Sequence, residues 1–149
     1  MNVIDTIDAV LKHKGAHVWT IRADATVFEA IRLMAEKNIG ALLVTSEGKL
    51  KGMFSERDYT RKIALHGRSS KDTHVREVIS DTLIAATPED TVEACLRIMT
   101  ENRIRHLPIL DGERVVGIVS IGDLVNWIIR VQDVAIYQLE SYISGQYPG

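Results

Sequence analysis

Apolar and polar residues follow two spacings along this chain, one typical of helices and one typical of short strands. Apolar residues recur every three or four positions in five segments, which predicts helices over 2–12, from Val27 past Met34, from Ser55 to about Leu65, from Pro88 to about Asn102, and onward from Leu124. Short apolar runs predict strands at Val18–Ile21, Ala41–Thr45, Leu50–Phe54, near Leu83–Ala85, at Leu107–Leu110 and at Val115–Val119.

Turn and capping residues separate these segments. Ser46-Glu47-Gly48 and Asp111-Gly112 suit the loops of two hairpins, and Lys12–Lys14 followed by Gly15 ends the first helix. Asp24 or Thr26 fits the N-cap of the second helix. The polar stretch 66–74 is the one clear linker.

The order of elements repeats. Residues 26–63 align with residues 91–128 at an offset of 65 without a gap, and 11 of the 38 positions are identical. We interpret the chain as an internal duplication, with a lead-in helix (1–17), a first repeat (18–66), a linker (67–80), a second repeat (81–130) and a helical extension with a frayed tail (131–149) that form one structural module. Each half alone is small for burying its sheet, so we expect the repeats to pack with pseudo-twofold symmetry.

Composition narrows the class of protein. The net charge of −2 gives no overall basic surface for nucleic acid, and the sequence shows neither a secretion leader nor an apolar run long enough to span a membrane. The single cysteine, Cys95, lies on an apolar helical stripe and is expected to be a buried small residue. We expect a cytoplasmic protein with no metal site, because the histidines have no ligand spacing.

A short motif occurs once in each repeat. Gly52–Asp58 and Gly117–Asp123 both fit G-x-[IVLMF]-S-x-x-D behind an apolar hairpin. The pair resembles the tandem cystathionine-β-synthase (CBS) domain, or Bateman module, over about residues 5–130. The resemblance implies an α/β fold with a β-α-β-β-α unit in each half and a cleft that binds an adenine nucleotide, AMP, ADP or ATP, or in some members NAD or S-adenosylmethionine.

The second repeat carries the better-equipped candidate site. A carboxylate such as Asp123 accepts hydrogen bonds from ribose hydroxyls, and a serine at a helix start suits phosphate, as do arginine and histidine donors. The resemblance implies that Arg105 and His106 hold the phosphate and Asp123 the ribose. The remaining candidates for this site are Ser120 and Gly122 at the helix start and, lining the adenine, Lys14, Val18, Ile39, Gly40 and Ala41.

The first repeat meets the pattern only in part. Ser55 and Asp58 would hold a ribose, but Gly40 and Ala41 stand where the second repeat has Arg105 and His106, so a phosphate would depend on Arg57 or on the other half. We therefore expect unequal sites. Each Ser-x-x-Asp also fits a capping box with a purely structural role, and Arg105 also fits a solvated surface charge.

The last helix suggests self-association. Apolar residues lie on more of its faces than one domain can cover, which favours a homodimer.

We predict a non-enzymatic module that senses adenine nucleotides and signals to an unidentified regulated protein. The alternative is a protein-interaction scaffold with a vestigial cleft; an enzyme is the weakest third reading, because no nucleophile, base and acid assemble from the sequence. Arg32–Glu36 and Arg97–Glu101 are expected surface pairs.

Overall fold

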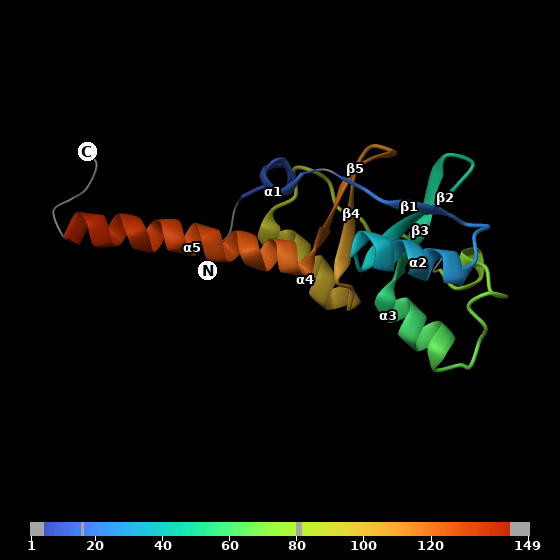
Figure 1. Cartoon of the computed structure of the whole chain (residues 1–149). Coiled ribbons are helices and arrows are strands. Elements are labelled where there is room, and N and C mark those ends of the chain that lie inside the picture. The colour runs from blue at the N-terminus through green and yellow to red at the C-terminus, as the bar shows by residue number, and fades with distance from the viewer. Residues whose placement is uncertain (1–4, 16, 80–81, 144–149) are drawn as a thin grey trace. The chain divides into compact units, whose positions relative to one another are not determined.

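The computed structural model describes residues 5–15, 17–79 and 82–143, and it divides the chain into two compact units (Figure 1). Unit 2 comprises residues 17–85. Unit 1 comprises residues 86–149 together with residues 1–16, so the N-terminal segment belongs to the unit that holds the second repeat. Each unit contains one sheet and its helices.

Unit 2 is built on a three-stranded sheet. Strand β1 (Thr20–Arg22) runs parallel to β2 (Ala41–Ser46), which pairs antiparallel with β3 (Lys49–Ser55). Helix α2 (Val27–Lys37) connects β1 to β2, and β3 leads into α3 (Glu56–Asp58), which continues as the π-helical segment η1 (Tyr59–Ala64). The turn between β2 and β3 places both Glu47 and Gly48 at positive φ, as tight hairpins require.

The core of unit 2 lies where α2 and η1 cover the sheet. Its buried residues are Val27, Ala30, Met34, Leu42, Val44, Phe54, Ile63, Val75 and Val78. The last two come from the segment expected to be a linker, which forms the short 3-10 helix η2 (Val75–Glu77). This segment is therefore packed against the first repeat, and His74 makes a bridge to Thr26 at the start of α2.

Unit 1 is built on the hairpin of β4 (His106–Asp111) and β5 (Arg114–Ser120). Helix α4 (Val92–Asn102) precedes the hairpin, α5 (Ile121–Ile143) follows it, and α1 (Ile7–Lys14) completes the unit. The N-terminal segment is fixed by backbone bonds, since Ile7 N–H donates to Asp90 O and Val92 N–H donates to Asp5 O. Among the fully buried side chains are Ile7, Leu107, Ile109, Val119 and Leu124.

Several predicted boundaries change. The first helix begins at Ile7, and Gly15 ends it at φ +94°. The strand expected at 18–21 covers Thr20–Arg22, and Thr26 rather than Asp24 caps α2, in a capping box with Glu29. Helix α4 begins at Val92 behind the N-cap Thr91, not at Pro88.

The strand expected near Leu83–Ala85 does not form among the described residues. Only Ala86 makes a bridge, to Ile109, where at the same offset of 65 Ile21 pairs with Val44. In unit 2, Leu43 N–H donates to Trp19 O at 3.1 Å. The equivalent of Leu43 is Pro108, which has no N–H, so this ladder bond cannot be made. The hairpin turn itself is Gly112-Glu113, with Asp111 still paired to Arg114.

Two surface predictions have different outcomes. Arg32 pairs with Glu36 at 3.2 Å as expected, whereas Arg97 pairs with Glu93 at 3.2 Å and not with Glu101. Arg97 has an acidic residue four positions away on each side, Glu93 and Glu101, and either spacing allows an ion pair along a helix. Within the extension expected over 131–149, α5 reaches Ile143, and residues 144–149 of the expected tail lie outside the described part of the chain.

Candidate functional site

The candidate carboxylate in unit 1 lies at the start of α5, where β5 passes directly into the helix. Ser120 N–H donates to Asp123 Oδ2 at 2.8 Å, and Asp123 N–H donates to Ser120 Oγ at 3.1 Å. These reciprocal bonds form a capping box. The capping role that the sequence left open is therefore present in the structure, and it holds the Asp123 carboxylate at a fixed place at the start of α5.

Lys14 joins this carboxylate from the last turn of α1. Its Nζ donates to Asp123 Oδ2 at 2.6 Å and to Ile118 O at 2.8 Å, and both side chains of the pair are about three-quarters buried, with 28% and 26% of their surface exposed. Burial raises the pKa of Asp123, but the Lys14 and Ser120 hydrogen bonds outweigh it, so the net pKa lies below the ordinary value. Asp123 is therefore a charged, partly desolvated acceptor at neutral pH.

Arg105 and His106 lie next to this cap because of the register of the hairpin. His106 begins β4 and pairs with Ser120, the last residue of β5. Arg105 O accepts a hydrogen bond from Ile121 N–H at 2.9 Å, while the residue as a whole is exposed. Gly122 is also exposed, on the first turn of α5. Unit 1 thus brings together six of the predicted site residues from segments far apart in sequence: Lys14, Arg105, His106, Ser120, Gly122 and Asp123.

Unit 2 has the same cap with different surroundings. Ser55 N–H donates to Asp58 Oδ2 at 2.9 Å, and Lys62 approaches Asp58 Oδ1 at 3.6 Å from the same helix. Gly40 O accepts from Glu56 N–H at 3.0 Å, and Ala41 pairs with Ser55, so these two residues hold the places of Arg105 and His106. No basic side chain occupies either place.

The other candidates of unit 2 are hydrophobic or half-buried. Ile39 packs against the core of the unit, Val18 lies half-buried shortly before β1, and Arg57 is half-buried on α3. The adenine-lining role of Val18, Ile39, Gly40 and Ala41 stays a prediction. The difference between the two caps is nevertheless a fact of the fold, since one carboxylate has a close lysine from another segment and the other has a distant one from its own helix.

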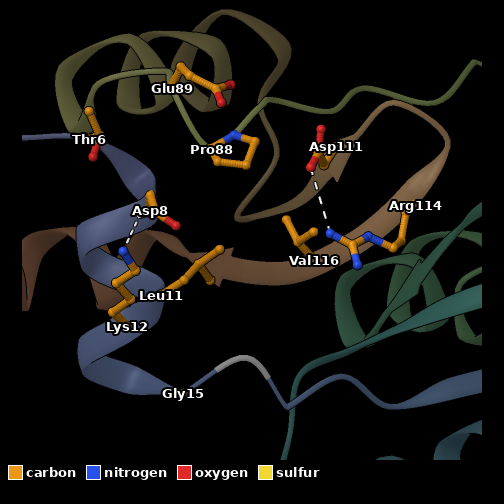
Figure 2. Close-up of a pocket in the computed structure, with 10 residues that line it drawn as sticks. All are labelled: Thr6, Asp8, Leu11, Lys12, Gly15, Pro88, Glu89, Asp111, Arg114 and Val116. Carbon is orange, nitrogen blue, oxygen red and sulfur yellow. Dashed lines mark ion pairs between the residues drawn. The ribbon is translucent and has the colours of Figure 1, made fainter.

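A separate open pocket of about 650 Å³ lies within unit 1 (Figure 2). It is lined by Thr6, Asp8, Leu11, Lys12, Gly15, Pro88, Glu89, Asp111, Arg114 and Val116. Its charged side chains largely pair with each other, Lys12 with Asp8 at 2.9 Å and Arg114 with Asp111 at 3.6 Å. Little uncompensated charge is left there to select an ionic ligand.

Other chemistry finds little support in the described residues. Burial raises the pKa of the Cys95 thiol to about 12, so the thiolate that would act as nucleophile is scarce at neutral pH. No group of three or more His, Cys, Asp or Glu side chains in the described part of the chain has the arrangement of a metal site. Within the same residues, no helix combines the length and apolarity that a membrane crossing requires.

Comparison with protein families identifies the family to which this chain belongs. The family description "CBS domain" matches residues 14–65 and 75–130, which are most of the chain and include both capping boxes. The chain belongs to the CBS-domain family. The two units are thus two CBS repeats of an α/β fold, which confirms the predicted resemblance and fold class.

Similar CBS proteins occur in plants and bacteria. The mitochondrial CBS domain-containing protein CBSX3 of Arabidopsis thaliana is 40% identical over 152 residues, covering 95% of this chain and 73% of its own. Among solved structures, a proposed signal-transduction protein with CBS domains from Burkholderia ambifaria is 43% identical with a TM-score of 0.80, covering 84% of this chain and 94% of that one. A hexameric CBS-CP12 protein from bloom-forming cyanobacteria is 28% identical with a TM-score of 0.74, covering 83% and 68%.

The sequence reasoning placed Lys14 near the adenine and missed its contact with Asp123. The two residues are 109 positions apart, and no local pattern links them. The basic end of α1, residues 12–14, is the one available signal, but a basic last turn is also what any helix favours. Only the packing of α1 on unit 1 selects Asp123 as the partner.

Proposed function

We propose that this protein is a regulatory module that binds an adenine nucleotide, AMP, ADP, ATP or NAD, in a cleft between its two CBS repeats and signals to a partner protein. The observation that carries the proposal is the Asp123 carboxylate, which is charged, partly buried and held by Ser120 beside an exposed arginine. A fixed carboxylate suits the two hydroxyls of a ribose, and Arg105 with His106 suits its phosphate.

Lys14 gives the module a way to report occupancy. Ribose hydroxyls that reach Asp123 compete with the Lys14 ammonium for the same carboxylate oxygen. A displaced Lys14 adds a cation for the phosphate and frees the last turn of α1. Nucleotide binding would then change how α1 is held against unit 1, and a partner protein that contacts α1 could read that change.

The two caps are proposed to differ in affinity. The Asp58 cap lacks basic residues at positions 40 and 41, and its phosphate contact would depend on Arg57 or on unit 1. We therefore propose that the Asp123 site fills first. We propose no catalytic step for the module, since the chemistry of its candidate residues suits holding a ligand.

Calorimetry with AMP, ATP and NAD tests this proposal, using Arg105→Ala against the control Arg114→Ala. Both arginines flank the same hairpin at opposite ends, and both are exposed, so neither change should disturb the fold. We expect Arg105→Ala to weaken binding at least ~10-fold, as loss of a charge-assisted bond does, and Arg114→Ala to leave it unchanged. Absence of binding by the native protein, or equal affinity in both variants, would refute the site.

A scaffold for protein association is the second candidate, because α5 exposes an apolar face. Val125, Ile129, Ile136 and Leu139 each have more than 40% of their surface exposed. In this reading the chain forms a homodimer and the cleft is vestigial. Nucleotide that co-purifies with the native protein, detected by mass spectrometry, would count against it. Both readings are proposed for a reducing compartment such as the cytoplasm, since the one cysteine is unpaired.

A further inference from the structure

Helix α5 carries a heptad pattern that continues past the CBS repeat. Counting Ile129 and Ile136 as a positions places Val125, Gln132 and Leu139 at d positions, and the next a position is 143, the last residue of the helix. Ile at the a positions 129 and 136, with Leu139 at one of the d positions, suits a two-stranded parallel coiled coil. Figure 1 shows α5, in orange and red, as one uninterrupted helix along this whole stretch.

The heptad face is not the face that holds α5 in unit 1. Leu124 is fully buried, and the Trp127 indole N–H donates to Asp5 Oδ2 at 2.9 Å, so the c and f positions of the first turns face the unit. The a and d side chains lie on the opposite side. Val125, Ile129, Ile136 and Leu139 have 45%, 48%, 54% and 60% of their surface exposed. These four apolar side chains, together with Gln132, form the α5 seam.

We propose that the α5 seam binds the α5 seam of a second copy of this chain in a parallel coiled coil. The charges beside the seam favour parallel over antiparallel helices. Asp133 and Glu140 occupy e positions, while the g positions Ile128 and Ala135 are uncharged. In a parallel pair each e residue lies beside a g residue of the other helix, so the acids meet only apolar side chains. An antiparallel pair would place e against e and bring the carboxylates together, which is unfavourable.

Gln132 fixes the register of the parallel pair. It is the one polar residue of the α5 seam, and a parallel alignment places it opposite Gln132 of the second copy. An amide has both donors and an acceptor, so two such side chains can satisfy each other, whereas a shifted register sets each against an apolar layer. The proposal deepens the self-association proposed above by naming its surface, and it is independent of nucleotide binding.

The first test compares the dimerisation of Ile136→Glu with that of Tyr137→Glu by analytical ultracentrifugation of the full chain. Ile136 lies in the α5 seam, whereas Tyr137 is the next residue, is also exposed, and lies off the seam at a b position. Burying a charge from each copy should weaken the dimer at least ~100-fold in the first variant. We expect no change in the second.

The second test fixes the direction of the helices by oxidative cross-linking. Gln132→Cys should form a disulfide between copies when an added oxidant takes up the two thiol hydrogens and electrons, while Gln138→Cys, at a c position, should not. Cys95 is buried and gives no background. A native dimer that Ile136→Glu leaves intact, or that cross-links equally at both positions, would overturn the α5 seam and leave self-association standing. A monomeric native protein would overturn both.

Discussion

Replacement of Lys14 by methionine removes one ammonium group and retains most of the side-chain volume. In the structure that group joins the end of α1 to the cap of α5, through Asp123 Oδ2 at 2.6 Å and Ile118 O at 2.8 Å. After the substitution Asp123 keeps the Ser120 N–H but loses its counter-charge in a site that is about three-quarters buried. The unit should therefore be less stable.

The expected loss follows from this geometry. A hydrogen bond to a charged group contributes about 1.5–3 kcal/mol, and the remaining exposure of the pair reduces its share through solvent screening. We expect Lys14→Met to lower the free energy of unfolding by about 1–2 kcal/mol. Lys62→Met is the matched control, because Lys62 likewise donates to a backbone carbonyl, Val78 O at 2.8 Å, but stands 3.6 Å from the equivalent carboxylate and is more exposed. Its loss of ion-pair energy should be within about 0.5 kcal/mol.

Urea denaturation followed by tryptophan fluorescence measures this difference. The chain has two tryptophans, Trp127 in unit 1 and Trp19 in unit 2. A Trp19→Phe background therefore reports unit 1, and a Trp127→Phe background reports unit 2 for the Lys62→Met control. Adding Asp123→Asn completes a double-mutant cycle, which isolates the Lys14–Asp123 coupling from the bond to Ile118 O. We expect a coupling of about 1 kcal/mol at neutral pH.

The pH dependence provides the refutation. The folded pKa of Asp123 is below its ordinary value of 3.8, so the stabilisation is fully present above that value and is lost as the pH falls through the folded pKa. The difference between the native protein and Lys14→Met should therefore be constant from pH 7 to about pH 5 and shrink towards pH 2. A coupling near zero, or a difference that does not change with pH, would show that the pair contributes nothing.

Three further outcomes follow from the packing. Gly117→Ala should destabilise unit 1 by about 1–3 kcal/mol in urea denaturation, because its Cβ would lie 2.6 Å from a Leu11 methyl, and Leu11→Ala should cost less stability in that variant than in the native chain. Thr91→Ala should cost about 1 kcal/mol by the same assay, since Thr91 Oγ1 accepts the Ala94 N–H at 3.0 Å. Cys95 should react with a thiol reagent only at the rate of unfolding, and fast reaction of the native protein would contradict its burial.

Much of each repeat could be predicted because its signals are local. The motif ending in Asp58 and Asp123 places a serine at the strand end and a carboxylate three residues later, which is all that a capping box requires. The hairpins and the apolar stripe of α2 likewise depend on spacing of a few residues. Because the two repeats align at an offset of 65, the elements predicted in one repeat also predict those of the other.

The outcomes that differ arise from contacts over long distances in the chain. Pro108 prevents a ladder bond to a segment more than twenty residues earlier, so the second sheet lost a strand that the duplication predicted. Val75 and Val78 join the first core although His74, Arg76 and Glu77, which precede and separate them, are polar. Neither effect can be predicted from the spacing of residues that are close together in the sequence.

The sequence by itself determined the family, the two capping boxes and the difference in basic residues between the two sites. These features depend only on the motif, its spacing and the presence of Arg105. Only the tertiary structure decided that α1 belongs with the second repeat and that Lys14 holds Asp123. The reason is physical: a helix buries its apolar face wherever a complementary surface is available, and the charge at its end then meets whatever lies there.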